Sequence, residues 1–285
     1  EPMPEPIVLA TPAEMSAWSR QALQAGKSIG FVPTMGALHA GHKSLMDRAR
    51  KENDLLAVSI FVNPTQFGPG EDFERYPRSF EADAQLCAEA DVDAIFQPTP
   101  QDMYAADART FVEVGGLQDV LCGLSRPGHF RGVATVVAKL FAIVRPARAY
   151  FGRKDAQQLR IIEVLSRDLH LGVTIVPCEI VREPDGLALS SRNKYLSPAQ
   201  RKQAVCLNQA LAHAQKRVAA GEKDAMALIG KMAELIEQAA PDAEIDYVAI
   251  VDMQTLQDVA AVSGGCMAAL AVKLGNTRLI DNMRL

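Results

Sequence analysis

Short apolar runs alternate with amphipathic segments through the first half of the chain. The apolar runs, each short and continuous like a strand covered on both faces, are residues 28–32, 55–63, 93–98, 149–152 and 172–181. Helical spacing occupies residues 42–52, 79–90 and 155–171, whereas residues 130–144 are apolar nearly all round and predict a buried helix. These repeated strand–helix units predict an α/β fold, a Rossmann-like doubly wound parallel sheet over residues 1–180.

The pattern changes near Val181. Residues 182–193 are polar and rich in turn-forming residues, and two helical stretches follow at 198–220 and 224–239. Strand patterns return at 244–252, 267–274 and 277–281. This order predicts a smaller α+β C-terminal domain over residues 181–285.

The composition narrows the class of protein. The chain has 285 residues, 48% of them hydrophobic and 22% charged, as is typical of a soluble globular protein. The net charge of -4 argues against a broad basic face for nucleic acid, and the five scattered cysteines, without a CxxC pair, argue against a disulfide framework or a thiolate zinc site. No apolar run approaches the roughly 18 residues of a membrane span, and the first residues do not resemble a signal peptide. We therefore expect a cytoplasmic protein that binds neither nucleic acid nor membrane.

The sequence VPTMGALHAGH, residues 32–42, joins the first of these strands to the helix that follows it. His39 and His42 therefore lie at the carboxyl end of a parallel strand, where ligands usually bind, and beside the positive end of a helix. Imidazole N–H groups there could stabilise a phosphate under attack. Two alternatives stay open on the residues alone: ordinary surface histidines, or two ligands of a zinc site. GxGxxG and P-loop motifs are absent, so any nucleotide is bound by other means.

Further polar clusters follow other predicted strands or precede the second domain. They are Asn63 with Gln66, Arg126 with His129 and Arg131, Lys154 with Asp155 and Gln158, and Ser190 with Ser191 and Arg192. For some of these residues, turn formation, helix capping or a solvated loop is an alternative to a ligand-binding role. Gln66 has no such structural explanation. Because most of the clusters lie near one edge of the predicted sheet, we expect one polar site with donors for a carboxylate and a polyphosphate.

These motifs together carry a specific resemblance. VPTMGALHAGH, SIFVNPTQF, YPR, SRPGHFRGV, FGRKDAQQL, DGLALSSRN and RLIDN occur in the order of the pantoate–β-alanine ligase family and span the chain from Phe31 to Asn282. The HxGH element alone is shared by the wider nucleotidyltransferase superfamily, which includes cytidylyltransferases and class I aminoacyl-tRNA synthetases. The full set resembles this ligase family specifically.

The resemblance implies an ATP-dependent, AMP-forming ligase of pantothenate and coenzyme A biosynthesis. Pantoate and ATP would form pantoyl adenylate and pyrophosphate, and β-alanine would then attack the acyl carbon to release pantothenate and AMP. The carboxylate of pantoate is ionised near neutral pH, so its attack needs no general base. The resemblance also implies Mg²⁺ with ATP, a homodimer, and a C-terminal domain that closes over ATP about a hinge at residues 181–183.

Residue roles follow from the resemblance position by position. The catalytic group, which would bind the triphosphate and stabilise the adenylation transition state, is His39, His42, Lys154, Ser190, Ser191 and Arg192. The pantoate group is Pro33, Met35, Asn63, Gln66 and Gln158. The ATP group is Met35, His39, His42, Gly152, Lys154, Asp155, Val181, Ser190, Ser191 and Arg192, and Tyr76 and Arg126 would lie near the same cleft.

Three positions depart from the expected family pattern. Arg153 stands where relatives usually carry an acidic residue or glutamine, which reverses the charge beside Lys154. Leu189 replaces a common methionine, a near-isosteric change. Asp83 lies where some relatives have a carboxylate associated with Mg²⁺, but its neighbour here is Ala82, so the metal ligands stay unassigned.

Two rival functions remain at this point. The first is another adenylating or cytidylyl-transferring enzyme of the superfamily, although the C-terminal domain gives little sign of the RNA-binding surface that a tRNA synthetase needs. The second is a catalytically silent nucleotide-binding module. Such a module would be expected to have lost the histidines or the lysine, and these are present.

Overall fold

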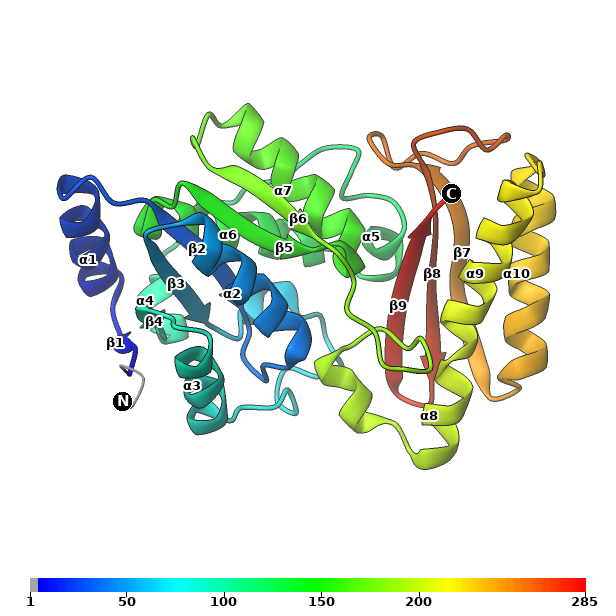
Figure 1. The fold of residues 1–285 in the computed structure, drawn as a ribbon, viewed down its shortest axis with the longest axis horizontal. Coiled ribbons are helices and arrows are strands. Elements are labelled where there is room, and N and C mark those ends of the chain that lie inside the picture. Colours follow the sequence, from blue (N-terminus) through cyan, green and yellow to red (C-terminus); the bar gives the residue numbers. More distant parts are fainter. Residues whose placement is uncertain (1–4) are drawn as a thin grey trace.

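The computed structural model describes residues 5–285, which form two sheets with helices packed against them (Figure 1). The larger sheet has six parallel strands in the order β1-β4-β3-β2-β5-β6. Its strands are β1 (Ile7–Leu9), β2 (Ile29–Thr34), β3 (Leu55–Ile60), β4 (Ala94–Phe96), β5 (Arg148–Gly152) and β6 (Thr174–Cys178). The chain proceeds from β2 through β3 to β4 in one direction and from β5 to β6 in the other. The strand order therefore reverses between β2 and β5.

Helices cover both faces of this sheet because alternate strand residues point to opposite sides. Phe31 and Ala57 pack with α1 (Pro12–Gln24), α6 (His129–Val144) and α7 (Ala156–Asp168). Val32 and Val58 pack on the other face with α2 (Ala40–Glu52) and α3 (Phe80–Glu89). The short helices α4 (Pro100–Met103) and α5 (Cys122–Ser125) lie in the connections. Burial on both faces explains the continuous apolar runs of these strands.

The C-terminal part has its own antiparallel sheet of β7 (Ala243–Asp252), β8 (Cys266–Leu274) and β9 (Thr277–Arg284). Helices α9 (Cys206–Ala219) and α10 (Ala225–Ala239) cover one face, where Ile250 and Ala268 are buried. Val251 and Ala269 point to the opposite face and join the core of the first part. The small sheet is thus packed between its helices and the large sheet's helices (Figure 1).

The predicted fold class is confirmed, with differences in detail. The helix predicted over 198–220 is divided at Val205 into α8 (Pro198–Ala204) and α9, although Val205 itself keeps right-handed helical angles, with φ of -63 and ψ of -21. β9 continues to Arg284 because it pairs with β8 along its whole length. β1 and α1 were not predicted. The domain boundary after residue 180 stays a prediction.

Two other findings bear on the sequence analysis. All five cysteines are free and buried within residues 5–285. None of the helices in this described part of the chain is long and apolar enough to cross a membrane.

Candidate active site

A cleft of ≈ 260 Å³ lies at the carboxyl ends of β2, β3 and β5 and includes residues 189–192 of the C-terminal part. This is the point where the strand order reverses, the usual ligand position in open α/β sheets. The predicted site residues all line it: Pro33, Met35, His39, His42, Asn63, Gln66, Tyr76, Arg126, Gly152, Lys154, Asp155, Gln158, Val181, Ser190, Ser191 and Arg192. Arg131, which we grouped with Arg126, lies outside the lining, and its guanidinium stacks on the Phe111 ring, 3.7 Å from the centroid.

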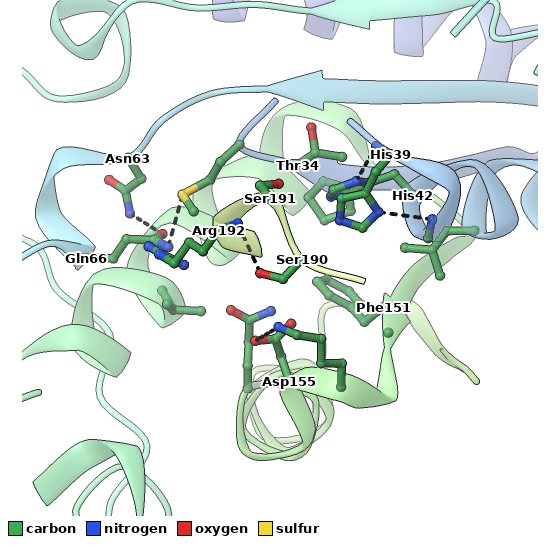
Figure 2. Close-up of a pocket in the computed structure, with 18 of the residues that line it drawn as sticks. Thr34, His39, His42, Asn63, Gln66, Phe151, Asp155, Ser190, Ser191 and Arg192 are labelled. Carbon is green, nitrogen blue, oxygen red and sulfur yellow. Dashed lines mark hydrogen bonds and ion pairs between the residues drawn. The ribbon is translucent and has the colours of Figure 1, made fainter. Parts of the chain in front are cut away.

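His39 and His42 cap the first turn of α2 with their own side chains (Figure 2). The Gly41 N–H donates to His39 Nδ1 at 3.0 Å, and the His39 N–H donates to His42 Nδ1 at 3.2 Å. The two ring centroids lie 4.2 Å apart. A Cβ on residue 41 would stand 2.7 Å from Cε1 of His39, so the arrangement requires glycine between the histidines.

These hydrogen bonds fix the tautomer of both imidazoles. A backbone N–H can only donate, so each Nδ1 is unprotonated and each neutral ring carries its proton on Nε2. Burial, reinforced by nearby positive charge, lowers the pKa of His39 to about 4 and that of His42 to about 3. Both rings are therefore neutral near pH 7, and each can offer an Nε2–H donor to a ligand in the cleft.

A buried carboxylate supports the turn before the histidines. Asp83 on α3 is 3% exposed and accepts hydrogen bonds from the N–H groups of Ala37 at 3.0 Å and Leu38 at 2.8 Å. Gly36 and Ala37 have φ values of 79 and 51, in the left-handed region that needs such support. Both carboxylate oxygens are engaged by this turn, which argues against Asp83 as a Mg²⁺ ligand.

Replacing Asp83 with asparagine is expected to lower the free energy of unfolding by about 1.5–3 kcal/mol, because an amide NH₂ would face a backbone N–H. Activity should fall as well, since His39 follows the turn directly. Urea denaturation measures the first effect, and Glu81→Gln, on the exposed side of the same helix, is the control. An Asp83→Asn protein as stable as the wild type would show that the turn does not depend on this carboxylate.

Lys154 and the Ser190–Arg192 segment come to the cleft from different parts of the chain. Lys154 follows β5, and its side chain is 22% exposed. Ser190 Oγ accepts a hydrogen bond from the Arg192 N–H at 3.2 Å. Asn282 of β9 donates to the backbone carbonyls of Arg153 at 2.8 Å and Lys154 at 3.0 Å. The C-terminal strand thus positions the turn that carries Lys154, a role that the RLIDN motif could have signalled.

Two arginines of the cleft are paired with neighbouring carboxylates. Arg126 donates to both oxygens of Glu71, at 2.9 and 2.6 Å, and Arg192 donates to both oxygens of Asp72, at 2.9 and 3.0 Å. Sequence reasoning missed these acidic residues, which are consecutive in one loop. An anionic ligand that contacts either arginine must share or displace its carboxylate.

The departure at Arg153 is partly compensated. Its guanidinium forms an ion pair with Glu179 at 2.9 Å, in which the Glu179 side chain is 82% exposed. An exposed pair of this kind is worth little in stability, but it reduces the positive charge added beside Lys154.

The floor of the cleft is apolar. Its residues come from α6 and from the ends of β3 and β5: Phe61, Val133, Val136, Val137, Leu140 and Phe151. Sequence analysis treated residues 130–144 only as a buried helix, although the spacing of these valines on one helix face was visible. Above this floor, the amides of Gln66 and Gln158 line the same cleft. The arrangement suits a small acid with an apolar branch and hydroxyl groups.

The zinc alternative gains no support from the geometry. Among residues 5–285, no group of three or more His, Cys, Asp or Glu side chains is placed to hold a metal ion. The Nδ1 atoms of the two histidines are already hydrogen-bonded to the backbone.

Comparison with known proteins decides the family. Residues 7–284 match the family described as pantoate-beta-alanine ligase. The chain belongs to the pantoate–β-alanine ligase family. The pantothenate synthetase of Heliobacterium modesticaldum is 55% identical over 270 residues, which are 95% of this chain and 96% of the relative. That of Thermotoga petrophila is 53% identical over 275 residues, 96% of this chain and 98% of the relative.

Solved structures of the pantoate–β-alanine ligase family share the fold. Pantothenate synthetase from Thermus thermophilus aligns with a TM-score of 0.92 at 44% identity and covers 98% of this chain and 99% of its own. The ligase from Francisella tularensis, described as complexed with beta-gamma ATP and beta-alanine, aligns with a TM-score of 0.80 at 35% identity, covering 98% and 97%. The predicted family and enzyme class are confirmed, and the rival of another adenylating family is excluded.

The buried histidines of this ligase should make its stability sensitive to mild acid. His39 and His42 have pKa values below their ordinary 6.5 in the folded chain, so the unfolded chain takes up protons first as the pH falls. The stability that depends on these neutral rings is complete above pH 6.5. It is lost as the pH falls towards the folded-state pKa values, about 4 for His39 and about 3 for His42. We expect the unfolding free energy to decrease between pH 7 and about 5, before most carboxylates protonate.

Urea denaturation at half-unit pH intervals measures this dependence. His42→Gln should weaken it, because glutamine does not titrate in this range. A wild-type unfolding free energy that is constant from pH 7 to about 5 would contradict the assignment of neutral, buried rings.

Proposed function

We propose that the chain condenses pantoate with β-alanine to pantothenate, using ATP, which becomes AMP and pyrophosphate. A carboxylate oxygen of pantoate attacks the α-phosphorus, and pyrophosphate leaves. The amine of β-alanine then attacks the acyl carbon of pantoyl adenylate, and AMP leaves. The observation that carries the proposal is the pair of neutral Nε2–H donors, His39 and His42, in one cleft with Lys154 and the Ser190–Arg192 segment.

The phosphate chemistry follows from these donors. Negative charge builds on the α-phosphate oxygens and on the departing pyrophosphate, and fixed N–H groups in a partly buried cleft stabilise it without reorganisation. Lys154 and Arg192 add positive charge along the triphosphate, with the Ser190 hydroxyl as a further donor. The Ser191 hydroxyl already donates to the Ala37 carbonyl at 3.0 Å, so the role predicted for Ser191 would use its backbone N–H. The reaction forms no covalent bond to the protein, so the lack of a nucleophile motif presents no difficulty.

The acid substrate fits the other end of the cleft. Pantoate carries two methyl groups on one carbon, which suit the apolar floor of Val133, Val136 and their neighbours. Gln66 and Gln158 supply amides for its hydroxyl groups and carboxylate, and Pro33 and Met35 line the same region. Asp155, Gly152 and Val181 remain for the adenosine, and Tyr76 and Arg126 remain unassigned candidates in the cleft.

Mg²⁺ is proposed to arrive with the nucleotide. Glu71 and Asp72 are paired with arginines, and Asp83 is hydrogen-bonded to backbone N–H groups. These carboxylates leave no evident all-protein cage, which fits the preference of Mg²⁺ for phosphate oxygens and water. Its chemistry would be neutralisation of the triphosphate charge, and no protein ligand is assigned.

A homodimer, a cytoplasmic location and closure of a C-terminal domain about residues 181–183 also belong to the proposal. Sedimentation velocity at micromolar concentration tests the dimer, and a monomer there would remove it. Small-angle scattering with and without ATP and pantoate tests closure. Identical scattering profiles would count against a large movement.

The function is tested by adding substrates in order. Mg-ATP and pantoate alone should release pyrophosphate, and later addition of β-alanine should yield AMP and pantothenate. If pantoate fails while another acid supports pyrophosphate release, the adenylating chemistry stands and the substrate assignment falls. Matched reactions with His39→Ala protein identify any contaminating activity.

A further inference from the structure

A chain of hydrogen bonds runs from outside the cleft to Gln66. The Tyr104 hydroxyl donates to Asn63 Oδ1 at 2.8 Å, and Asn63 Nδ2 donates to Gln66 Oε1 at 3.0 Å. Asn63 is 1% exposed and lines the cleft, whereas Tyr104, which follows α4, is not among the lining residues. Figure 2 shows Asn63 and Gln66 at one side of the site, joined by this bond.

Backbone groups assign the oxygen and the nitrogen of the Asn63 amide, and the hydroxyls of Tyr104 and Thr65 add donors to its oxygen. Its Oδ1 lies 3.3 Å from the Thr65 N–H, which can only donate, and its Nδ2 lies 3.2 Å from the Gly132 carbonyl, which can only accept. A flipped amide would place donor against donor and acceptor against acceptor. Residue 132 must be glycine for this approach, because a Cβ there would overlap the Thr65 carbonyl.

The fixed Asn63 amide in turn orients Gln66. Since Asn63 Nδ2 donates to Gln66 Oε1, the other end of that amide, Nε2, is directed into the cleft, 3.3 Å from Met35 Sδ (Figure 2). A thioether is a weak acceptor, which a substrate oxygen can replace. Gln66 therefore presents N–H groups, rather than its oxygen, to the bound acid.

The Tyr104 ring is held by a cation and by a neighbouring aromatic ring, Phe61, whose centroid lies 6.5 Å away. The Lys139 ammonium lies 4.2 Å from the centroid of the Tyr104 ring and donates to the Met103 carbonyl at 2.6 Å. The ring stays anchored even without its hydroxyl. Loss of the hydroxyl would therefore remove one of three donors to Asn63 Oδ1, the other two being the N–H and the hydroxyl of Thr65, while leaving the packing of residue 104 in place.

We propose that Tyr104 is a positioning residue for the acid substrate: through Asn63 it fixes the Gln66 amide so that Nε2–H faces the carboxylate or hydroxyl oxygens of that acid. The inference rests on the proposed function for the identity of the acid. It assigns no contact between Tyr104 and substrate. Its effect is therefore on affinity for the acid rather than on the phosphate chemistry.

The test is a double-mutant cycle. Tyr104→Phe should raise KM for pantoate about 3- to 10-fold, the value of one lost hydrogen bond, with kcat and KM for ATP within about twofold of wild type. In a Gln66→Ala background the same change should have no further effect on KM for pantoate. Tyr150→Phe, which removes a buried hydroxyl bonded to Glu52 and Asn53 away from the cleft, is the matched control and should leave KM unchanged.

An unchanged KM for pantoate in Tyr104→Phe, or an equal rise with and without Gln66, would overturn the proposal and reduce Tyr104 to a packing residue. If Tyr104→Phe does not fold, Thr65→Val removes another donor to Asn63 Oδ1 and should give a smaller rise that also vanishes with Gln66→Ala. Wild-type pyrophosphate release with pantoate judges the proposed function separately from this cycle.

Discussion

Replacement of His42 by alanine is expected to slow adenylate formation by about 2 to 4 kcal/mol of activation free energy, roughly 30- to 800-fold. The Nε2–H of this ring is directed by its Nδ1 bond to the backbone and stays neutral near pH 7, so it donates without a conformational change. Pantoate affinity should change far less, because the acid is assigned to the Gln66 end of the cleft. Rapid-quench measurement of pyrophosphate in a single turnover gives the rate directly.

His42→Asn separates capping from catalysis. Asparagine can place Oδ1 where His42 Nδ1 accepts the His39 N–H, but it cannot reach the position of Nε2. We expect near wild-type stability in the asparagine variant with a rate as low as that of alanine. A single-turnover rate equal to wild type in His42→Ala would remove this residue from transition-state stabilisation.

Replacement of Asp281 by alanine is expected to lower the free energy of unfolding by about 3–5 kcal/mol, because it leaves a partly buried arginine unpaired. Asp281 accepts two hydrogen bonds from Arg182, at 2.7 and 2.9 Å, and their side chains are 2% and 22% exposed. The pair joins β9 to the segment after β6. The neighbouring Asn282 positions the backbone of Lys154, so affinity for ATP should also fall.

Asp185→Ala provides the matched control for this loss. Asp185 also pairs with an arginine through two bonds, to Arg201 at 2.8 and 3.1 Å, but the two side chains are 45% and 33% exposed. An exposed pair contributes only about 0.2–1 kcal/mol. Equal losses in the two variants, measured by urea denaturation, would show that burial does not determine the value of the Asp281 pair.

Much of the fold was predictable from the sequence because the strands are buried on both faces and read as continuous apolar runs. Of the two elements named as missed, β1 has a weak local signal and α1 has a clear one. β1 has three residues, of which Ile7 and Val8 are about half exposed, so no run marks it. α1 did have a signal, the capping box of Thr11 and Glu14 with Pro12 between them.

The site was predictable where a residue follows a strand, as at His39, Gln66 and Lys154, because topology brings the strand ends together. Pairings across distant segments were not predictable. Glu71 meets Arg126, and Asp72 meets Arg192, across 55 and 120 residues, and no local pattern marks those contacts. The hydrogen bonds that join Tyr104 to Gln66 through Asn63 were not predictable for the same reason.

The most direct test of the central claim follows an oxygen atom. Pantoate labelled with ¹⁸O in its carboxylate is mixed with Mg-ATP and β-alanine, and the AMP formed is examined by mass spectrometry. If a pantoate carboxylate oxygen attacks the α-phosphorus in this cleft, the phosphate of AMP acquires one labelled oxygen and pantothenate retains the other. Unlabelled AMP beside singly labelled pantothenate, with the other labelled oxygen in a different phosphate product or in water, would contradict adenylation of pantoate and with it the roles assigned to the histidine pair.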